Sequence, residues 1–304
     1  MEFNLYQKEA LGTDRVPVRD SENTLPLIVP MLGLAGETGQ LLSEYKKHLR
    51  DGEAHRLFKE RVSEELGDLL WYIANVASKF DLDLNDVAEA NLAKVRARWL
   101  AERTEPLYFD ATLPEGERLP RQFEVALLDV TDGGHRRVRV LINGVAFGNE
   151  LTDNAYDPDG YRFHDIFHLA YAAVLNWSPV TRALLRRKRK SNPLLDEVED
   201  GGRAAVIEEG VAALVFDYAR RHRMLEGVGA LDFQLLRTIK DMTSHLEVKR
   251  CSTGEWEQAI LQGFKVWRAV FKTHGGRIAM DLDQRRIVYL GPVVSDQAGS
   301  SPPP

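Results

Sequence analysis

One segment of the sequence places oxygen-bearing side chains at a spacing suited to metal binding. In GLAGETGQLLSEYKK, residues 33–47, Glu37, Gln40 and Glu44 occupy positions i, i+3 and i+7. At about 100° per residue, these three side chains share one face of a helix. They form either a solvated surface or one wall of a metal site.

A second acidic group follows in the next helical segment, EELGDLLWYIANVA. Here Glu65 and Asp68 lie at positions i and i+3 and point to the same side of a helix, with Glu64 next to them. Carboxylates beside an apolar, buried surface are costly unless they are paired or bind a cation. Two antiparallel helices could therefore bring these oxygens together around Mg²⁺, which also accepts substrate phosphates as ligands. The alternative is that the acids form ordinary exposed faces.

Four segments resemble, in the same order, the MazG-type all-α nucleoside triphosphate pyrophosphohydrolases. YQKEALGT resembles their opening helix, GLAGETGQLLSEYKK the helix of their E-x-x-E motif, EELGDLLWYIANVA that of their E-x-x-D motif, and LNDVAEANLAKVRAR their final helix. The resemblance implies Mg²⁺-dependent hydrolysis of an NTP or dNTP to the monophosphate and pyrophosphate, with Mn²⁺ as an alternative ion. It also implies a homodimer or a higher homo-oligomer.

The resemblance assigns roles to individual residues. Glu37, Glu65 and Asp68 are implied to be the catalytic Mg²⁺ ligands. Asn91 and Lys94, at i and i+3 on the last of these helices, are implied to contact the substrate phosphates.

The chain departs from the family pattern at Gln40, where the first motif has its second acidic residue. An amide oxygen can bind a hard cation, but it contributes no charge. We expect Gln40 to remain a ligand, and Glu64 or Glu44 to compensate for the missing charge.

A second candidate site lies in YDPDGYRFHDIFHLAYAAVLNW. His164 and His168, at i and i+4, share one helix face with Asp165 beside the first, and two imidazoles at this spacing can bind one metal ion. Glu209, or its neighbour Glu208, could supply a third ligand from a later helix. The alternative is a buried network of histidines bonded to acids. The C-terminal half of the chain resembles the C-terminal extension of some MazG-like proteins. This resemblance does not indicate an activity.

The run RRKRK at residues 186–190 could contact the phosphates of a nucleotide or RNA. The alternative is a solvated helix end, neutralised by DEVED at residues 196–200. We do not expect nucleic-acid binding, because the net charge of the chain is −6.

The composition limits the remaining possibilities. Cys251 is the one cysteine, which excludes a disulfide framework or a cysteine-built zinc site within the chain. The N-terminus does not resemble a signal peptide, and no segment approaches the roughly 20 apolar residues of a membrane span. We therefore expect a cytoplasmic protein without membrane contact.

The expected fold class is mainly α. An all-α MazG-like domain at residues 1–105 is followed by a linker at 106–121, a mostly helical α+β domain with small β-hairpins at 122–292, and a disordered tail at 293–304. The expected helices are 6–11, 27–50, 53–80, 84–98, 161–177, 180–190, 203–221, 232–245 and 255–274. The expected hairpins are FEVALLDV with RRVRVLIN, and RIAMDL with RRIVYL.

Three functions fit these features. The first is an NTP pyrophosphohydrolase in the N-terminal domain. The second is a nucleotide sensor, in which the Gln40 site binds nucleotide, turns it over slowly and controls the C-terminal domain. The third is a separate metal-dependent phosphohydrolase built on the His164 and His168 site.

Overall fold

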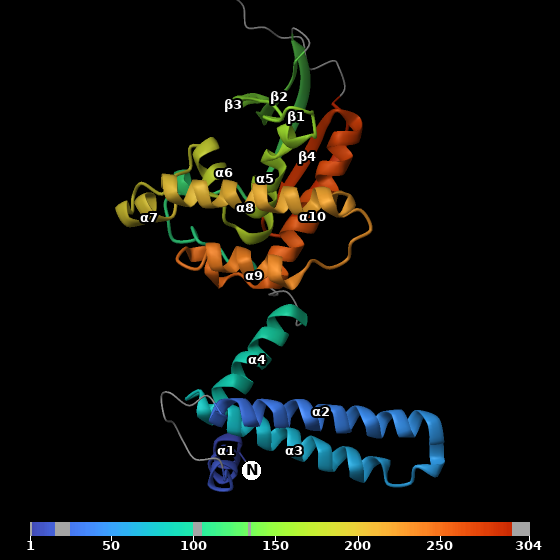
Figure 1. Cartoon of the computed structure of the whole chain (residues 1–304). Coiled ribbons are helices and arrows are strands. Elements are labelled where there is room, and N and C mark those ends of the chain that lie inside the picture. The colour runs from blue at the N-terminus through green and yellow to red at the C-terminus, as the bar shows by residue number, and fades with distance from the viewer. Residues whose placement is uncertain (1, 16–24, 100–104, 133–134, 294–304) are drawn as a thin grey trace, which may run out of the picture. The chain divides into compact units, whose positions relative to one another are not determined.

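The computed structural model describes residues 2–15, 25–99, 105–132 and 135–293, and it divides into two compact units, Met1–Arg96 and Ala97–Pro304. Helices make up most of the described chain taken as a whole, as the mainly α prediction requires (Figure 1). The predicted tail lies outside the described residues from position 294 on. No helix among the described residues is long and apolar enough to cross a membrane.

The first unit is helical throughout its described length. Its helices are α1 (Phe3–Gly12), α2 (Leu25–Asp51), α3 (Phe58–Lys79) and α4 (Leu84–Trp99). The long helices α2 and α3 lie side by side as an antiparallel hairpin (Figure 1). We expected the third helix to begin at Glu53, but it begins at Phe58. Gly52 has a left-handed φ of 56° and starts a short 3-10 turn there, which delays α3.

Close approach of α2 and α3 depends on Gly33. A Cβ atom at this position would lie 2.1 Å from Cε1 of Tyr72 on α3. Because glycine has no side chain, the Tyr72 ring packs directly against the backbone of α2. This contact holds together the two helices that carry the acidic residues.

The first unit leaves much of its apolar surface exposed. The buried apolar cluster in its described part consists of Ala10, Ala74, Ala77 and Leu84. The helical spacing of Leu66, Leu69, Leu70 and Ile73 in the sequence predicts that they share a buried face of α3, but Leu66 and Ile73 are 52% and 41% exposed. That prediction is wrong for the single chain, because neither residue belongs to the core that α1, α3 and α4 build.

The second unit contains a five-stranded antiparallel sheet. Its strands are β1 (Gln122–Asp132), β2 (His135–Ile142), β3 (Val145–Leu151), β4 (Gly275–Asp281) and β5 (Arg286–Gly291), in the order β3-β2-β1-β4-β5. Both predicted hairpins are present, and they join into one sheet because β1 pairs with β4, with Val125 opposite Ile278. Strand β3 was not predicted.

Helices pack on one face of this sheet and surround α5 (Asp165–Leu175), which is buried along its whole length. The other helices are α6 (Pro179–Leu184), α7 (Pro193–Val198), α8 (Gly202–Arg221), α9 (Phe233–Met242) and α10 (Thr253–Thr273). Helix α10 lies closely against α5, since a Cβ atom at Gly263 would be 3.1 Å from Cβ of Ala170. The core therefore centres on α5, which also carries His168.

Buried ion pairs anchor the basic run. We expected a helix from 180 to 190 with solvated cations at its end, but α6 stops at Leu184 and Arg189 is 0% exposed. The Arg189 guanidinium donates to Asp200 at 2.7 Å and pairs with Glu247 at 2.7 Å. The acidic segment at 196–200 therefore does neutralise part of the run, from inside the protein rather than at its surface.

The segment expected to be a linker, residues 106–121, packs against the second unit. Asp110 is 1% exposed and accepts from Arg182 at 2.9 Å and from Arg121 at 2.6 Å. Leu119 is 2% exposed and belongs to the same apolar core as the sheet. The prolines of this segment thus interrupt regular structure without detaching the chain.

Replacing Arg189 with methionine should destabilise the second unit by about 3 kcal/mol or more, because the fully buried carboxylate of Asp200 loses its main partner. Urea unfolding followed by tryptophan fluorescence measures this, since Trp177, Trp256 and Trp267 are buried in this unit.

Lys190→Met is the matched control, because Lys190 belongs to the same run but is exposed. It should shift unfolding by no more than about 0.5 kcal/mol. Equal effects of the two substitutions would contradict the assignment of Arg189 to a buried ion pair.

Candidate functional site

The predicted acidic ligands of the first unit lie together. One carboxylate oxygen each from Glu37 on α2 and from Glu65 and Asp68 on α3 lie within 4.8 Å of one another. Glu65 is buried, Glu37 is half-buried and Asp68 is exposed. The cluster therefore has a buried end and an end open to solvent.

The electrostatics of this cluster favour a cation. Burial raises the pKa of Glu65, and the nearby carboxylates of Glu37, Asp68 and Glu64 raise it further. Its Oε2 atom is buried and has no hydrogen-bond partner. A divalent ion among these carboxylates would supply the missing partner and remove the like-charge repulsion, so the residues present fit the ion that the sequence predicts.

Gln40 lies next to the cluster. Its Nε2 donates a hydrogen bond of 2.7 Å to Oε2 of Glu37, and its side chain is exposed. The amide thus orients the Glu37 carboxylate by donating to it. Glu64 points elsewhere: it is exposed and pairs with Nη1 of Arg61 at 2.8 Å. Glu64 does not belong to the group of three acids that a metal ion could join.

Glu44 has a structural role in this chain. Its buried carboxylate accepts from Lys47 and lies 3.0 Å from Nε2 of His55 in the connection to α3. The ammonium of Lys47 holds the pKa of Glu44 below its usual value. These contacts tie the end of α2 to the turn, so Glu44 does not replace the charge missing at Gln40.

The predicted phosphate contacts lie on α4. Asn91 is exposed. The side chain of Lys94 lies outside the described residues. Their proposed role on phosphates stays a prediction.

The second predicted group also comes together, in the second unit. His164, His168 and Glu209 each offer one ligand atom within 4.8 Å of the others. His164 and His168 come from the start of α5, and Glu209 comes from α8. Asp165 lies beside them, with Oδ1 at 3.8 Å from Nε2 of His164.

The charges around His168 are balanced. Burial lowers its pKa, but the carboxylates of Glu208 and Glu209 outweigh this effect and raise the pKa to about 10. The imidazole in turn lowers the pKa of Glu209. The positively charged form of the His168 imidazole is therefore stabilised between Glu208 and Glu209.

Ser178 supports the second group and was not anticipated. It is the N-cap of α6, and its hydroxyl donates to Oε1 of Glu208 at 2.6 Å. The Ser-Pro pair at residues 178–179 is a recognisable helix start, but nothing local to it indicates a partner 30 residues away.

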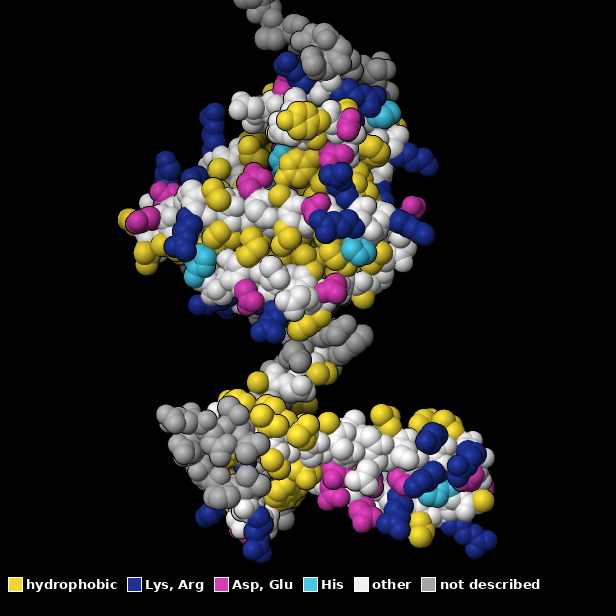
Figure 2. Space-filling view, in the orientation of Figure 1, with side chains coloured by type: hydrophobic (Ala, Val, Ile, Leu, Met, Phe, Trp, Pro, Cys, Tyr) yellow, Lys and Arg dark blue, Asp and Glu magenta, His cyan; other side chains and the backbone are white. Residues whose placement is uncertain are grey.

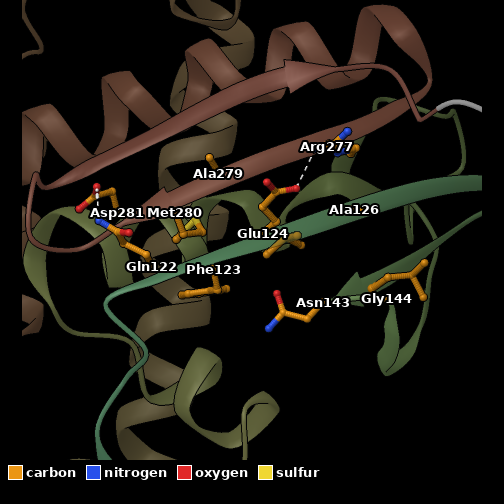
Figure 3. A pocket seen from close by; sticks show the side chains of 12 residues that line it. Gln122, Phe123, Glu124, Ala126, Asn143, Gly144, Arg277, Ala279, Met280 and Asp281 are labelled. Atoms are coloured by element: carbon orange, nitrogen blue, oxygen red, sulfur yellow. Dashed lines mark hydrogen bonds and ion pairs between the residues drawn. The ribbon is translucent and has the colours of Figure 1, made fainter.

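A trough on the sheet of the second unit has a volume of about 750 Å³ (Figure 3). It follows β1 and β4, and Glu124 pairs across it with Arg277 at 3.0 Å. Because its charged side chains are already paired and exposed, it offers no reactive group, and the two clusters above remain the candidate sites.

Comparisons with known proteins assign both units. Residues 30–99 match the MazG nucleotide pyrophosphohydrolase domain, and residues 104–292 match the MazG C-terminal domain. The chain is 34% identical over 101 residues to the Gene 37 protein of Mycobacterium phage L5. The aligned region covers 32% of this chain and 89% of that protein. No solved structure matches.

The helical hairpin with its three carboxylates, followed by a matching C-terminal domain, shows that the chain belongs to the MazG family. The family implies nucleotide pyrophosphohydrolase activity, and it generally depends on a divalent metal.

Replacing Gln40 with glutamate should strengthen Mg²⁺ binding about tenfold, because a fourth carboxylate would face the cation in place of an amide. Isothermal titration with Mg²⁺ measures the dissociation constant. Thr38→Glu is the control, since it adds the same charge to the exposed side of the same helix, away from Gln40. Unchanged affinity in Gln40→Glu would count against a ligand role for this position.

Proposed function

We propose that the first unit hydrolyses nucleoside triphosphates, NTPs or dNTPs, to the monophosphate and pyrophosphate with Mg²⁺, or Mn²⁺ in its place. The observation that carries this proposal is the group of three carboxylates within 4.8 Å, with a buried Glu65 oxygen that lacks a partner. It lies in the segment that matches the MazG nucleotide pyrophosphohydrolase domain.

In this proposal the open end of the cluster meets the substrate. Glu65 anchors the ion from the buried side, and the exposed Asp68 lies where a triphosphate can approach from solvent. Bound Mg²⁺ supplies neutralisation of the phosphate oxygens and a more acidic bound water. Gln40 holds Glu37 in place through its amide hydrogen bond. Asn91 and Lys94 contribute a donor amide and a cation to the phosphates.

Substituting Glu65 with glutamine or Asp68 with asparagine should lower pyrophosphate release at least about a hundredfold, because each change removes a charged ligand and keeps the shape of the side chain. The assay measures pyrophosphate released from a panel of NTPs and dNTPs with Mg²⁺.

Glu60→Gln provides the control, as Glu60 is an exposed acid one turn earlier on α3. Full activity in both ligand variants would reject the proposed site. Tight nucleotide binding by the unmodified protein without turnover would instead favour a sensor, an outcome that the amide at Gln40 makes worth testing.

We also propose that the first unit assembles with a second copy of the chain. Apolar side chains gather on the surface of this unit around the N-terminal half of α2 (Figure 2). The exposed apolar residues of α2 and α4 include Ile28, Val29, Met31, Leu32, Val87, Leu92 and Val95. An exposed apolar surface of this extent on a small helical unit marks an interface. The same assembly would cover α4 and bring further groups to the substrate.

Leu32→Lys should shift the protein towards the single chain in analytical ultracentrifugation, because a charge at this 66% exposed position opposes burial in an interface. Leu194→Lys is the matched control, since Leu194 is 68% exposed on α7 of the second unit. A single-chain mass for the unmodified protein at micromolar concentration would contradict the proposed assembly.

A further inference from the structure

We propose that His164, His168 and Glu209 form a binding site for a transition-metal ion in the second unit. The site is independent of the carboxylate cluster in the first unit and does not rest on the proposed hydrolysis. It comprises two imidazoles and one carboxylate, a ligand set that suits Zn²⁺, Fe²⁺, Mn²⁺ or Co²⁺ better than Mg²⁺.

The first imidazole is fixed in the orientation that metal binding requires. Nδ1 of His164 lies 2.9 Å from the backbone carbonyl oxygen of Tyr161. A carbonyl can only accept, so Nδ1 carries the hydrogen, and the lone pair of the neutral ring is on Nε2. The Tyr161 ring stacks on the imidazole with centroids 4.6 Å apart, which keeps His164 in this position.

The second imidazole is fixed by a buried carboxylate. Nδ1 of His168 lies 2.9 Å from Oε1 of Glu208, which is 0% exposed. Glu208 also accepts from the Ser178 hydroxyl at 2.6 Å and from the Val180 amide at 2.9 Å, so both of its oxygens act as acceptors and Nδ1 of His168 donates to Oε1. A carboxylate behind a histidine in this way is the usual support of a metal-binding imidazole.

This arrangement turns both Nε2 atoms towards one place. Nε2 of His168 belongs to a completely enclosed ring and lies 3.3 Å from Oε2 of Glu209. A metal ion bound between these two atoms would take the place of the proton on Nε2. Two ligand atoms on a tetrahedral ion with bonds of about 2.05 Å are about 3.3 Å apart, so this separation already suits a shared ion.

The site is open on one side. The side chain of Glu209 is 46% exposed, whereas that of His168 is 0% exposed, so an ion can enter past Glu209 and meet the imidazoles behind it. Three protein ligands leave at least one coordination position for water or an anionic group. Asp165, near His164, is placed to accept a hydrogen bond from such a ligand.

The backbone before His164 is built to hold this geometry. Gly160 has a φ of 89°, and a Cβ atom there would lie 2.6 Å from the Phe271 ring. Its carbonyl accepts from Nε1 of Trp267 at 3.1 Å. The turn that leads into α5 is therefore held by α10, and the position of His164 does not depend on the metal ion.

The test uses the full chain carrying Glu65→Gln and Asp68→Asn, which disables the site in the first unit. Titration with Co²⁺, followed by the visible d–d absorption of the ion and by isothermal calorimetry, should show one equivalent bound with the spectrum of a low-coordinate histidine site. In the same chain, His164→Gln and Glu209→Gln should each weaken binding at least about tenfold.

Asp217→Asn is the matched control, because Asp217 is an exposed acid on the same helix as Glu209 and pairs with Arg221. Glu209→Gln keeps the test valid if the buried histidine variant unfolds, since Glu209 is partly exposed. The absence of stoichiometric Co²⁺ binding would overturn the proposal. Binding that neither His164→Gln nor Glu209→Gln weakens would overturn it equally.

Discussion

The cost of removing a charged side chain from water governs both units of this protein. Such a group is stable inside a protein only when an opposite charge or a set of hydrogen bonds is buried with it. In the second unit Arg189 and Asp200 meet this condition within the chain. In the first unit Glu65 does not, because its close neighbours Glu37 and Asp68 are also acids. One arrangement is complete by itself, while the other is one that a cation would stabilise.

The same contrast explains why Gln40 is tolerated. A second glutamate at this position would add repulsion to a cluster that already lacks a positive partner. The amide instead donates a hydrogen bond to Glu37, which stabilises the carboxylates before any ion arrives. Compared with a glutamate at this position, the amide therefore makes the metal-free cluster more favourable.

Local spacing made the candidate sites predictable. Glu65 and Asp68 are one turn apart on α3, and Glu37 lies on the preceding helix, α2. Because the connection between these two helices is short, they form a hairpin that brings the three acids together. His164 and His168 are predictable for the same reason. The helical and strand periodicities also identified most elements of both units, because each depends on neighbouring residues.

Contacts between distant segments were not predictable from the sequence. The burial of Arg189 depends on Glu247, 58 residues later, and a run of cations by itself indicates solvent exposure. Leu66 and Ile73 show the opposite error, because their apolar pattern indicates burial but both are exposed. A helical apolar pattern does not reveal whether the surface that packs against it belongs to the same chain. The pairing of β1 with β4 could not be predicted from local sequence patterns either, because the two strands are far apart in the sequence.

That strand pairing has a consequence for how the protein is made. Strand β1 lies at the centre of the sheet, yet its partner β4 is synthesised some 140 residues later, on the order of ten seconds at ribosomal speed. In the first unit, α2 and α3 are neighbours along the chain and can pair while translation continues. Until β4 is made, one edge of this central strand stays unpaired, and an unpaired strand edge is prone to aggregation.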